Sequence, residues 1–373
     1  MGYRIFSEDD YRKSKATFGI TRDVDVTRHA ENQARITGKL NEIVDPAVNP
    51  IRRSMIRLNP HLKKWIATLG CPMDIEVNCD TTGSMGGEVD TEMAVLPDLC
   101  GAVALVLEGY DPQLCLGIFG DVVDQFVLCR PQFEMTAEKI VEYLKEMAPQ
   151  RNGGDSAEDP QYAMFARAYL TDAYTNKIGL KGYHFIVTDA ICHEDISRRQ
   201  IMRIFGENIF ENELKNMTTT PRIEDVIAEL KKKTHQFILV LDDPSTARFW
   251  RRLCGDKSVV EINSTKELPA VISAIIGLTE GTLDITDVEA HLRKVLDIQG
   301  HARDNYLNEL ARHVSNIDIC AQLKLRHAME HPVPVVGDIF ENKEDIWPSM
   351  HGDIPSDGFS AEDVTESDTI QYL

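Results

Sequence analysis

The chain has 373 residues, more than the roughly 100 to 200 of one ordinary domain, so one full-sized core with extensions is expected. Hydrophobic residues make up 43% of the sequence and charged residues 27%, which supports a packed core and excludes general disorder. The net charge of −20 excludes nucleic acid as the main partner, because phosphates repel an acidic surface.

Residues 1–72 are basic, with 13 Lys or Arg against 8 Asp or Glu. They lack strand patterns and are interrupted by Pro46, Pro50 and Pro60, so a largely helical N-terminal extension is predicted. The first residues lack the apolar core of a signal peptide, and no stretch approaches the roughly 20 apolar residues that span a bilayer. We therefore expect a cytoplasmic protein without a membrane partner.

Residues 73–282 alternate short apolar runs with helical patterns. Runs rich in Ile, Val, Leu and Phe predict strands at 73–79, 114–120, 125–129, 183–188, 236–242 and 258–262. Helices are predicted at 92–108, 137–147, 160–174, 197–215, 221–233, 245–253 and 266–279. This alternation indicates an α/β fold with a doubly wound, mostly parallel sheet. The short connection FGDVVDQF predicts a hairpin, and therefore one antiparallel edge strand.

Two segments follow this domain. Thr286 and Glu289 have the spacing of a capping box, and a helical pattern continues to about residue 328, so a helical extension is predicted at 283–329. Residues 330–373 contain 11 Asp or Glu against one Lys, which predicts an acidic, partly disordered tail. Apolar residues within the tail, among them Trp347, are typical of a docking peptide.

Three loops of the central domain carry an unusual number of oxygen ligands. Asp80, Thr82 and Ser84 follow the first strand at alternate positions, Asp155 lies in GGDSAE before a helix, and Asp189 ends the fourth strand. Ligands bind open parallel sheets at the carboxyl ends of the strands, so these side chains are candidate metal ligands. Each carboxylate taken singly is also compatible with a helix cap. Carboxylates and hydroxyls favour Mg²⁺, with Mn²⁺ or Ca²⁺ as alternatives, over Zn²⁺.

The D-x-T-G-S-M motif at residues 80–85 resembles the signature of the von Willebrand factor type A (VWA) domain, whose metal-ion-dependent adhesion site (MIDAS) begins D-x-[ST]-x-S. Asp189 in VTDA matches the late aspartate of that site. GGDSAE looks like the G-G-G-D-x-P-E loop of the subgroup found with alpha-kinases and hemicentins. The resemblance covers roughly residues 73–282 and implies one metal ion held by all five candidates. Asp155 stands where threonine is usual, so Glu158 is an alternative ligand from the same loop.

The resemblance implies a binding module rather than an enzyme, in which the metal ion coordinates an acidic residue of a partner protein. Family members often serve intracellular assemblies, so an AAA+ ATPase is a candidate partner. The acidic tail leaves a homo-oligomer, or a self-assembling structural protein, as an alternative. Between copies or within one chain, the tail is expected to contact the metal site or a basic cluster within 1–72 that includes Arg52, Arg53, Arg57, Lys63 and Lys64. Within one chain it would shield the site until a partner displaces it.

Two further features of the sequence bear on function. Ser84, Asp189 and His235 occur in the Ser, Asp, His order of the α/β hydrolases, which leaves a serine hydrolase as the enzyme alternative. The elbow motif G-x-S-x-G fails, because threonine stands at position 82. In the first strand, Glu76 and Asn78 alternate with apolar residues, which predicts polar partners on one face.

Overall fold

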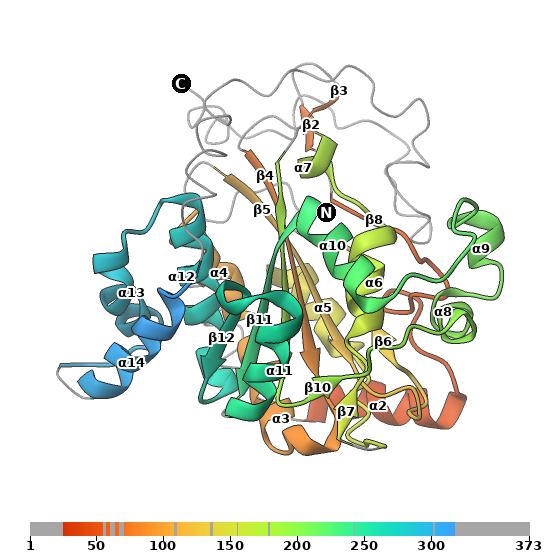
Figure 1. Cartoon of the computed structure of the whole chain (residues 1–373), viewed down its shortest axis with the longest axis horizontal. Coiled ribbons are helices and arrows are strands. Elements are labelled where there is room, and N and C mark those ends of the chain that lie inside the picture. Colours follow the sequence, from red (N-terminus) through yellow and green to blue (C-terminus); the bar gives the residue numbers. More distant parts are fainter. Residues whose placement is uncertain are drawn as a thin grey trace.

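The computed structural model describes residues 25–54, 57–59, 64–66, 71–107, 110–134, 137–154, 156–177, 180–241, 243–300 and 303–317. A six-stranded sheet forms its centre, in the order β12-β11-β9-β4-β5-β6 (Figure 1). The strands are β4 (Cys71–Asp80), β5 (Tyr110–Phe119), β6 (Leu128–Cys129), β9 (Gly182–Thr188), β11 (Thr234–Leu241) and β12 (Val259–Ile262). All neighbours pair in parallel except β5 and β6. The predicted α/β class with one antiparallel edge strand is confirmed.

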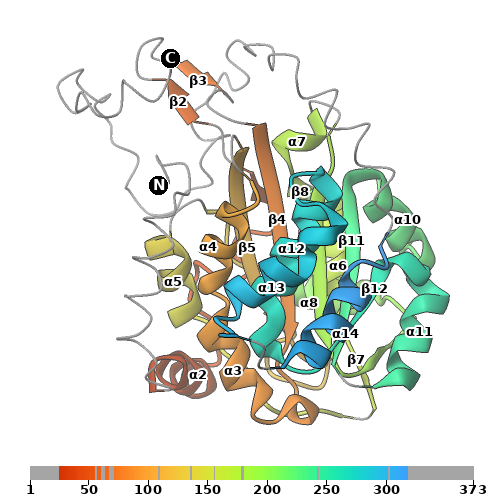
Figure 2. The ribbon, with the colours of Figure 1, turned by 90° about the vertical axis from the view of Figure 1, so that its left-hand side faces the viewer.

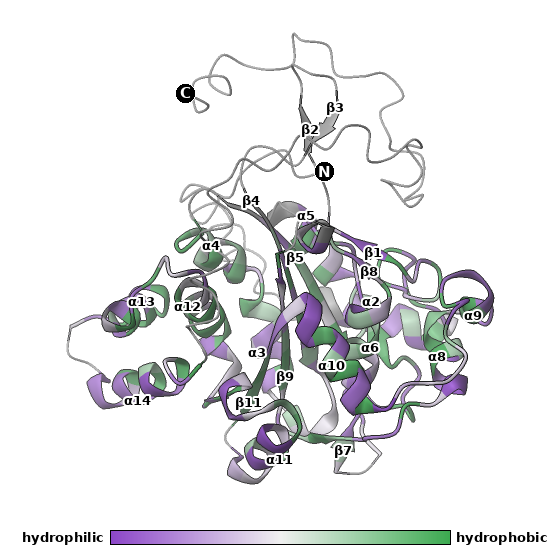
Figure 3. Ribbon diagram, turned by 45° about the horizontal axis from the view of Figure 1, so that its top comes forward, coloured by the Kyte–Doolittle hydropathy of each residue, from purple (hydrophilic) through white to green (hydrophobic). Residues whose placement is uncertain are grey.

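Helices cover both faces of this sheet (Figure 2). One core contains side chains of α3 (Glu88–Val95), α4 (Asp98–Ala104), α5 (Ala137–Lys145) and α12 (Leu268–Glu280). The other contains side chains of α6 (Gln161–Tyr169), α8 (Arg198–Phe205), α9 (Ile209–Asn212), α10 (Ile223–Lys233) and α11 (Pro244–Cys254). The central strands and α12 are mainly hydrophobic, whereas α10, α11 and α14 (Asp304–Val314) mix hydrophobic and hydrophilic residues (Figure 3). Because the parallel strands run in one direction, their carboxyl ends share one edge.

Three long predicted helices are each divided in two. The pattern at 92–108 becomes α3 and α4, separated at Pro97, which has no amide hydrogen to continue the first helix. The pattern at 197–215 becomes α8 and α9, separated at Gly206, whose φ of 99° suits glycine. After residue 283, η4 (Ile285–Asp287) leads into α13 (Val288–Val295), and Gly300 lies between it and α14. Among the described residues, no helix has both the length and the apolar composition needed to cross a membrane.

Both extensions contribute to the core. Ala34 of α2 (Asp25–Thr37) and Leu310 of α14 belong to the same buried cluster as β4.

Although no strand is predicted in the N-terminal extension, three short ones occur there. β1 (Arg52–Arg53) pairs with β8 (Thr171–Asp172), and β2 (Arg57–Asn59) pairs with β3 (Lys64–Ile66). The tail at 330–373 lies outside the described residues. Further short helices are η1 (Gly83–Met85), α7 (Tyr174–Lys177), η2 (Asp256–Ser258) and η3 (Thr265–Glu267).

A buried network of charged side chains lies on one face of β4. Arg130 donates to both carboxylate oxygens of Glu76, at 2.7 and 2.8 Å, and both side chains are fully buried. Asp74 forms an ion pair with Arg167 of α6. Asn78 donates to Glu76 at 3.2 Å. These contacts confirm the polar partners that the alternating pattern of the first strand predicts.

His184 of β9 belongs to this network as an uncharged histidine. Its titration makes the free energy of unfolding depend on pH. Its Nδ1 lies 2.5 Å from Oε1 of Gln236, an acceptor, so Nδ1 carries the proton. Burial lowers the pKa of His184 to about 4, from 6.5. The unfolded chain therefore binds this proton near pH 6.5, and the folded chain only near pH 4. We expect the free energy of unfolding to fall by up to about 3 kcal/mol between these values.

Calorimetry between pH 7 and 4.5 tests this prediction. The His184→Gln variant should lose less stability across this interval than the native protein, because glutamine does not titrate. Other buried histidines, including His235 and His291, contribute equally to both proteins and so cancel from the comparison. Identical slopes of unfolding free energy against pH would contradict the prediction.

Candidate metal site

Backbone hydrogen bonds join three loops at the carboxyl edge of the sheet. In the first loop, the turn η1 (Gly83–Met85) follows β4, and the Gly83 amide donates to the Asn152 carbonyl at 2.5 Å. The Arg151 amide donates to the Thr81 carbonyl at 2.9 Å. β7 (Ala157–Glu158) pairs with β10 (Ile191–Cys192), which joins this middle loop to the segment after β9. The three loops singled out in the sequence therefore lie together.

Four of the five predicted ligands form a continuous row of oxygen atoms. Asp80 is fully buried, and its Oδ1 accepts hydrogen bonds from the amide and hydroxyl of Thr82, at 2.9 and 2.6 Å. The Thr82 hydroxyl lies 3.3 Å from that of Ser84, which donates to Asp189 at 2.9 Å. Asp155 lies outside the described residues.

Hydrogen bonds set the spacing of these oxygens, and the same spacing is compatible with a small divalent cation. Neighbouring ligands about 2.1 Å from Mg²⁺ in an octahedron are about 3 Å apart. Along the row, successive oxygens are 2.6, 3.3 and 2.9 Å apart. In the described ranges, no three carboxylate, thiol or imidazole side chains are grouped to hold a metal ion. The hydroxyls of Thr82 and Ser84 would therefore have to act as ligands together with Asp80 and Asp189.

Carboxyl groups crowd this edge of the sheet. Burial raises the pKa of Asp80 to about 6, although hydrogen bonds from threonine oppose the shift. Burial and repulsion by Asp80 raise the pKa of Glu158 to about 9. Burial also raises the pKa of Asp189 and of Glu92, which is fully buried. No ion pair within the described part of the chain joins a lysine or arginine to these four groups, so a bound cation would relieve their repulsion.

Glu158 has the position that a ligand from the middle loop requires. It is 2% exposed, and its Oε2 has no hydrogen-bond partner among the described residues. Thr82 and Asp80 both lie close enough to influence the pKa of Glu158, which places its carboxyl group near the row of oxygens. The His193 amide donates to the Glu158 carbonyl at 3.1 Å, which fixes the backbone here. Both oxygens of Glu92 are also buried without a partner, so the unpaired oxygen alone does not mark a ligand; it is the position of Glu158 in the middle loop that makes it a candidate.

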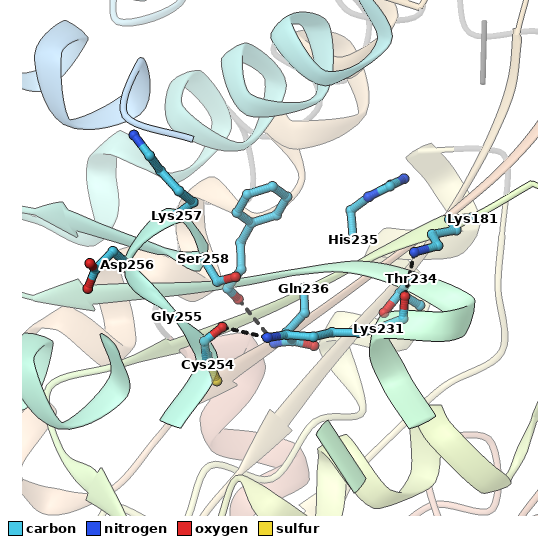
Figure 4. A pocket seen from close by; sticks show the side chains of 11 residues that line it. Lys181, Lys231, Thr234, His235, Gln236, Cys254, Gly255, Asp256, Lys257 and Ser258 are labelled. Carbon is cyan, nitrogen blue, oxygen red and sulfur yellow. Dashed lines mark hydrogen bonds between the residues drawn. The ribbon is translucent and has the colours of Figure 1, made fainter. Parts of the chain in front are cut away.

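The catalytic triad of the enzyme alternative is not assembled. His235 lies at the start of β11, where its ring packs against Tyr183 at the start of β9, with centroids 5.2 Å apart. Ser84 and Asp189 lie after the carboxyl ends of β4 and β9, at the other edge of the sheet from His235. The six residues from His235 to Leu241 span roughly 20 Å of extended chain. His235 instead lines a pocket together with lysines (Figure 4).

No family model and no curated protein matches the chain. Among solved structures, proximal thread matrix protein 1 from the mussel byssus is 12% identical, with a TM-score of 0.37, over 56% of this chain and 48% of that protein. The pilus adhesin SpaC from Lactobacillus rhamnosus GG is 10% identical, with a TM-score of 0.38, over 60% of this chain and 31% of the adhesin. The chain thus matches less than half the length of either protein. These likenesses carry no argument about function.

Proposed function

We propose that the chain is a cytoplasmic, metal-dependent protein-binding module of the VWA type. Asp80, Thr82, Ser84 and Asp189 would hold Mg²⁺, or Mn²⁺ or Ca²⁺, together with Asp155 or Glu158 from the middle loop. The row of closely spaced oxygens from Asp80 to Asp189 is the observation that carries this proposal. The bound cation would coordinate an acidic side chain of a partner protein.

The four residues that form the row of oxygens differ in burial, and therefore in their proposed roles. Asp80 is fully buried and fixes the Thr82 hydroxyl. Ser84 is exposed and Asp189 partly exposed, so the outer side of the site remains open to a partner. With Asp80 and Asp189 as ligands, the protein charge balances a divalent ion. A third carboxylate makes the site with its divalent ion negatively charged overall, which weakens the attraction of the ion for an acidic partner. The shape of the surface around the site must therefore contribute to partner recognition.

Replacing Glu158 by glutamine is expected to weaken Mg²⁺ binding at least tenfold. The substitution keeps the shape but removes a charge beside the row of oxygens. Isothermal titration calorimetry on the native protein and the variant provides the measurement. Asp195→Asn is the matched control, because Asp195 is an exposed carboxylate near the same edge. Unchanged affinity in Glu158→Gln, with a loss in Asp155→Asn, would instead assign the middle ligand to Asp155.

Recovery of a partner from the native host tests the function itself. The full chain should retain a protein partner in the presence of Mg²⁺ and release it with EDTA, and Ser84→Ala should reduce recovery. An AAA+ ATPase is the first partner class to examine, by the family resemblance, and a second copy of the chain is another. Equal recovery with Mg²⁺ and with EDTA would contradict a metal-dependent contact.

A further inference from the structure

A pocket of about 380 Å³ opens beside the amino-terminal half of β11, away from the candidate metal site (Figure 4). Residues 234–237 of β11, the ends of α10 and α11, and η2 (Asp256–Ser258) line it. β12 pairs only with residues 238–241 of β11. On that side, residues 234–237 therefore have no described strand beside them. Thr234, Gln236 and Phe237 are only 2 to 6% exposed, so the ends of α10 and α11 together with η2 cover this edge, and the exposed residues of the lining are Lys231 and residues 255–257.

Three lysines line the pocket, and none forms an ion pair with a described carboxylate. Lys181 donates to the Lys231 carbonyl at 2.5 Å, and Lys231 donates to the Cys254 carbonyl at 2.7 Å. Lys257 donates to the side chain of Asn316 at 2.5 Å. The first two bonds satisfy carbonyl groups at helix ends, which is a common structural role of lysine. Each ammonium group has three hydrogens, so two on each remain for other acceptors.

The charge of this pocket is unusual for this protein. On the same helix as Lys231, both Lys232 and Lys233 form ion pairs with Glu229. The pocket lysines lack such a partner in the described ranges, and Asp256 is the one acidic residue of the pocket lining. The pocket therefore has an excess of positive charge in a chain whose net charge is −20. An anionic ligand would balance it.

The chain itself carries a segment of matching chemistry. Residues 330–373 contain 11 Asp or Glu and one Lys, with apolar residues between them. The described part of the chain ends at Ile317, directly after the Asn316 that Lys257 contacts. The 13 residues from 317 to 330 span up to about 45 Å when extended, so the acidic segment is tethered within reach of the pocket. Tethering raises its effective concentration to the millimolar range.

The basic cluster suggested by the sequence is a poorer partner for this segment. Arg52 is buried and donates to the Arg130 carbonyl at 2.7 Å. Arg53 lies 3.7 Å from the carboxylate of Asp172. The side chains of the other three members lie outside the described residues. Arg52 is therefore removed from the candidate cluster, because its guanidinium group is not accessible.

We propose that the pocket binds part of the acidic segment 330–373 of the same chain. The carboxylates of the bound stretch contact Lys181, Lys231 and Lys257. Single exposed ion pairs contribute only about 0 to 1 kcal/mol, so several ion pairs act together at the effective concentration that the tether provides. This contact is independent of the proposed metal-dependent function.

Carbodiimide cross-linking of the full chain tests the proposal, because the reagent joins a lysine amine to a carboxylate that touches it. Mass spectrometry of the monomer fraction should identify links between a pocket lysine and an Asp or Glu of 330–373. We expect a yield at least fivefold above that of Lys215, an exposed lysine outside the pocket. Yields no higher than for Lys215, or links found only in dimers, would overturn the proposal. Protection of the pocket lysines by inorganic phosphate without any link to the tail would also overturn it.

Hydrogen exchange provides a second measurement on the full chain. The triple variant Lys181→Gln, Lys231→Gln, Lys257→Gln should expose the amides of Asp256 and Lys257, which line the pocket on its exposed side, with exchange at least tenfold faster than in the native protein. The corresponding triple arginine variant keeps the charges and should retain the protection. Equal exchange in the glutamine and native proteins would contradict the docking. Faster exchange throughout the fold would signal general destabilisation, and the cross-linking result then decides.

Discussion

Replacement of Asp80 by asparagine is expected to reduce Mg²⁺ affinity at least 100-fold while the fold is retained. Asp80 is fully buried, and its charge is the part of the proposed site that solvent cannot replace. The asparagine oxygen can still accept the two hydrogen bonds from Thr82. Thr188 donates to the other carboxylate oxygen at 2.7 Å, and its hydroxyl can rotate to accept from the new amide.

Thermal unfolding separates this effect from simple damage. In the native protein, Mg²⁺ at 100 times its dissociation constant should add about 2.7 kcal/mol to the free energy of unfolding. Asp80→Asn should show no such gain. Without metal, the variant should be at least as stable as the native protein, because burial opposes the Asp80 charge and raises its pKa to about 6. A variant that still gains stability from Mg²⁺ would contradict the role of Asp80.

The sequence predicts the fold because strand and helix patterns are local. Apolar runs correctly locate all six strands of the central sheet, and the short connection after Phe119 predicts the antiparallel pair. The helix patterns extend too far where one residue changes the chain direction, as Pro97 and Gly206 do. Strand β1 could not be predicted, because it has only two residues and pairs with a segment more than 100 residues away, whereas β2 and β3 are local neighbours of three residues each, too short for a strand pattern.

The predicted ligands come together for a topological reason. Asp80 is the last residue of β4 and Asp189 directly follows β9, and these two strands are parallel neighbours. Sequence reasoning cannot give the orientation of a side chain in an irregular loop. The partnerless oxygen of Glu158 is therefore visible only in the structure, although its place in GGDSAE indicates it as an alternative ligand. His235 shows the opposite error, because residue order suggests a triad that the strand direction prevents.

Charge pairing inside the sheet is the part that the sequence does not reveal. Glu76 indicates that β4 has polar partners, but Arg130 lies 54 positions away in the chain. The two meet because Arg130 follows β6, which pairs with β5 beside β4. A lone charged residue within a strand pattern therefore predicts that a partner exists, without identifying it.

Replacement of Arg130 by methionine is expected to destabilise the fold by about 3 to 5 kcal/mol, because the buried Glu76 loses both hydrogen bonds from Arg130 and keeps only Arg167, 4.0 Å away, as a counter-charge. Both side chains are fully buried. Burial acts to raise the pKa of Glu76, but Arg130 holds it at about 2. The loss is a large fraction of the 5 to 15 kcal/mol that stabilises a typical domain. Arg251→Met, which breaks a partly exposed pair with Glu261, should cost no more than about 1 kcal/mol.

Urea denaturation of these variants, with the double variant Glu76→Gln, Arg130→Met, identifies the cause of the loss. Glutamine removes the buried charge and keeps an oxygen that can accept from Asn78, as Glu76 does at 3.2 Å. The double variant should therefore recover about 1 to 3 kcal/mol relative to Arg130→Met. The penalty in Arg130→Met should also shrink below pH 5, because a buried Glu76 that lacks Arg130 then takes up a proton. A double variant no more stable than Arg130→Met, with a penalty independent of pH, would show that Arg130 stabilises the fold through its packing and not through Glu76.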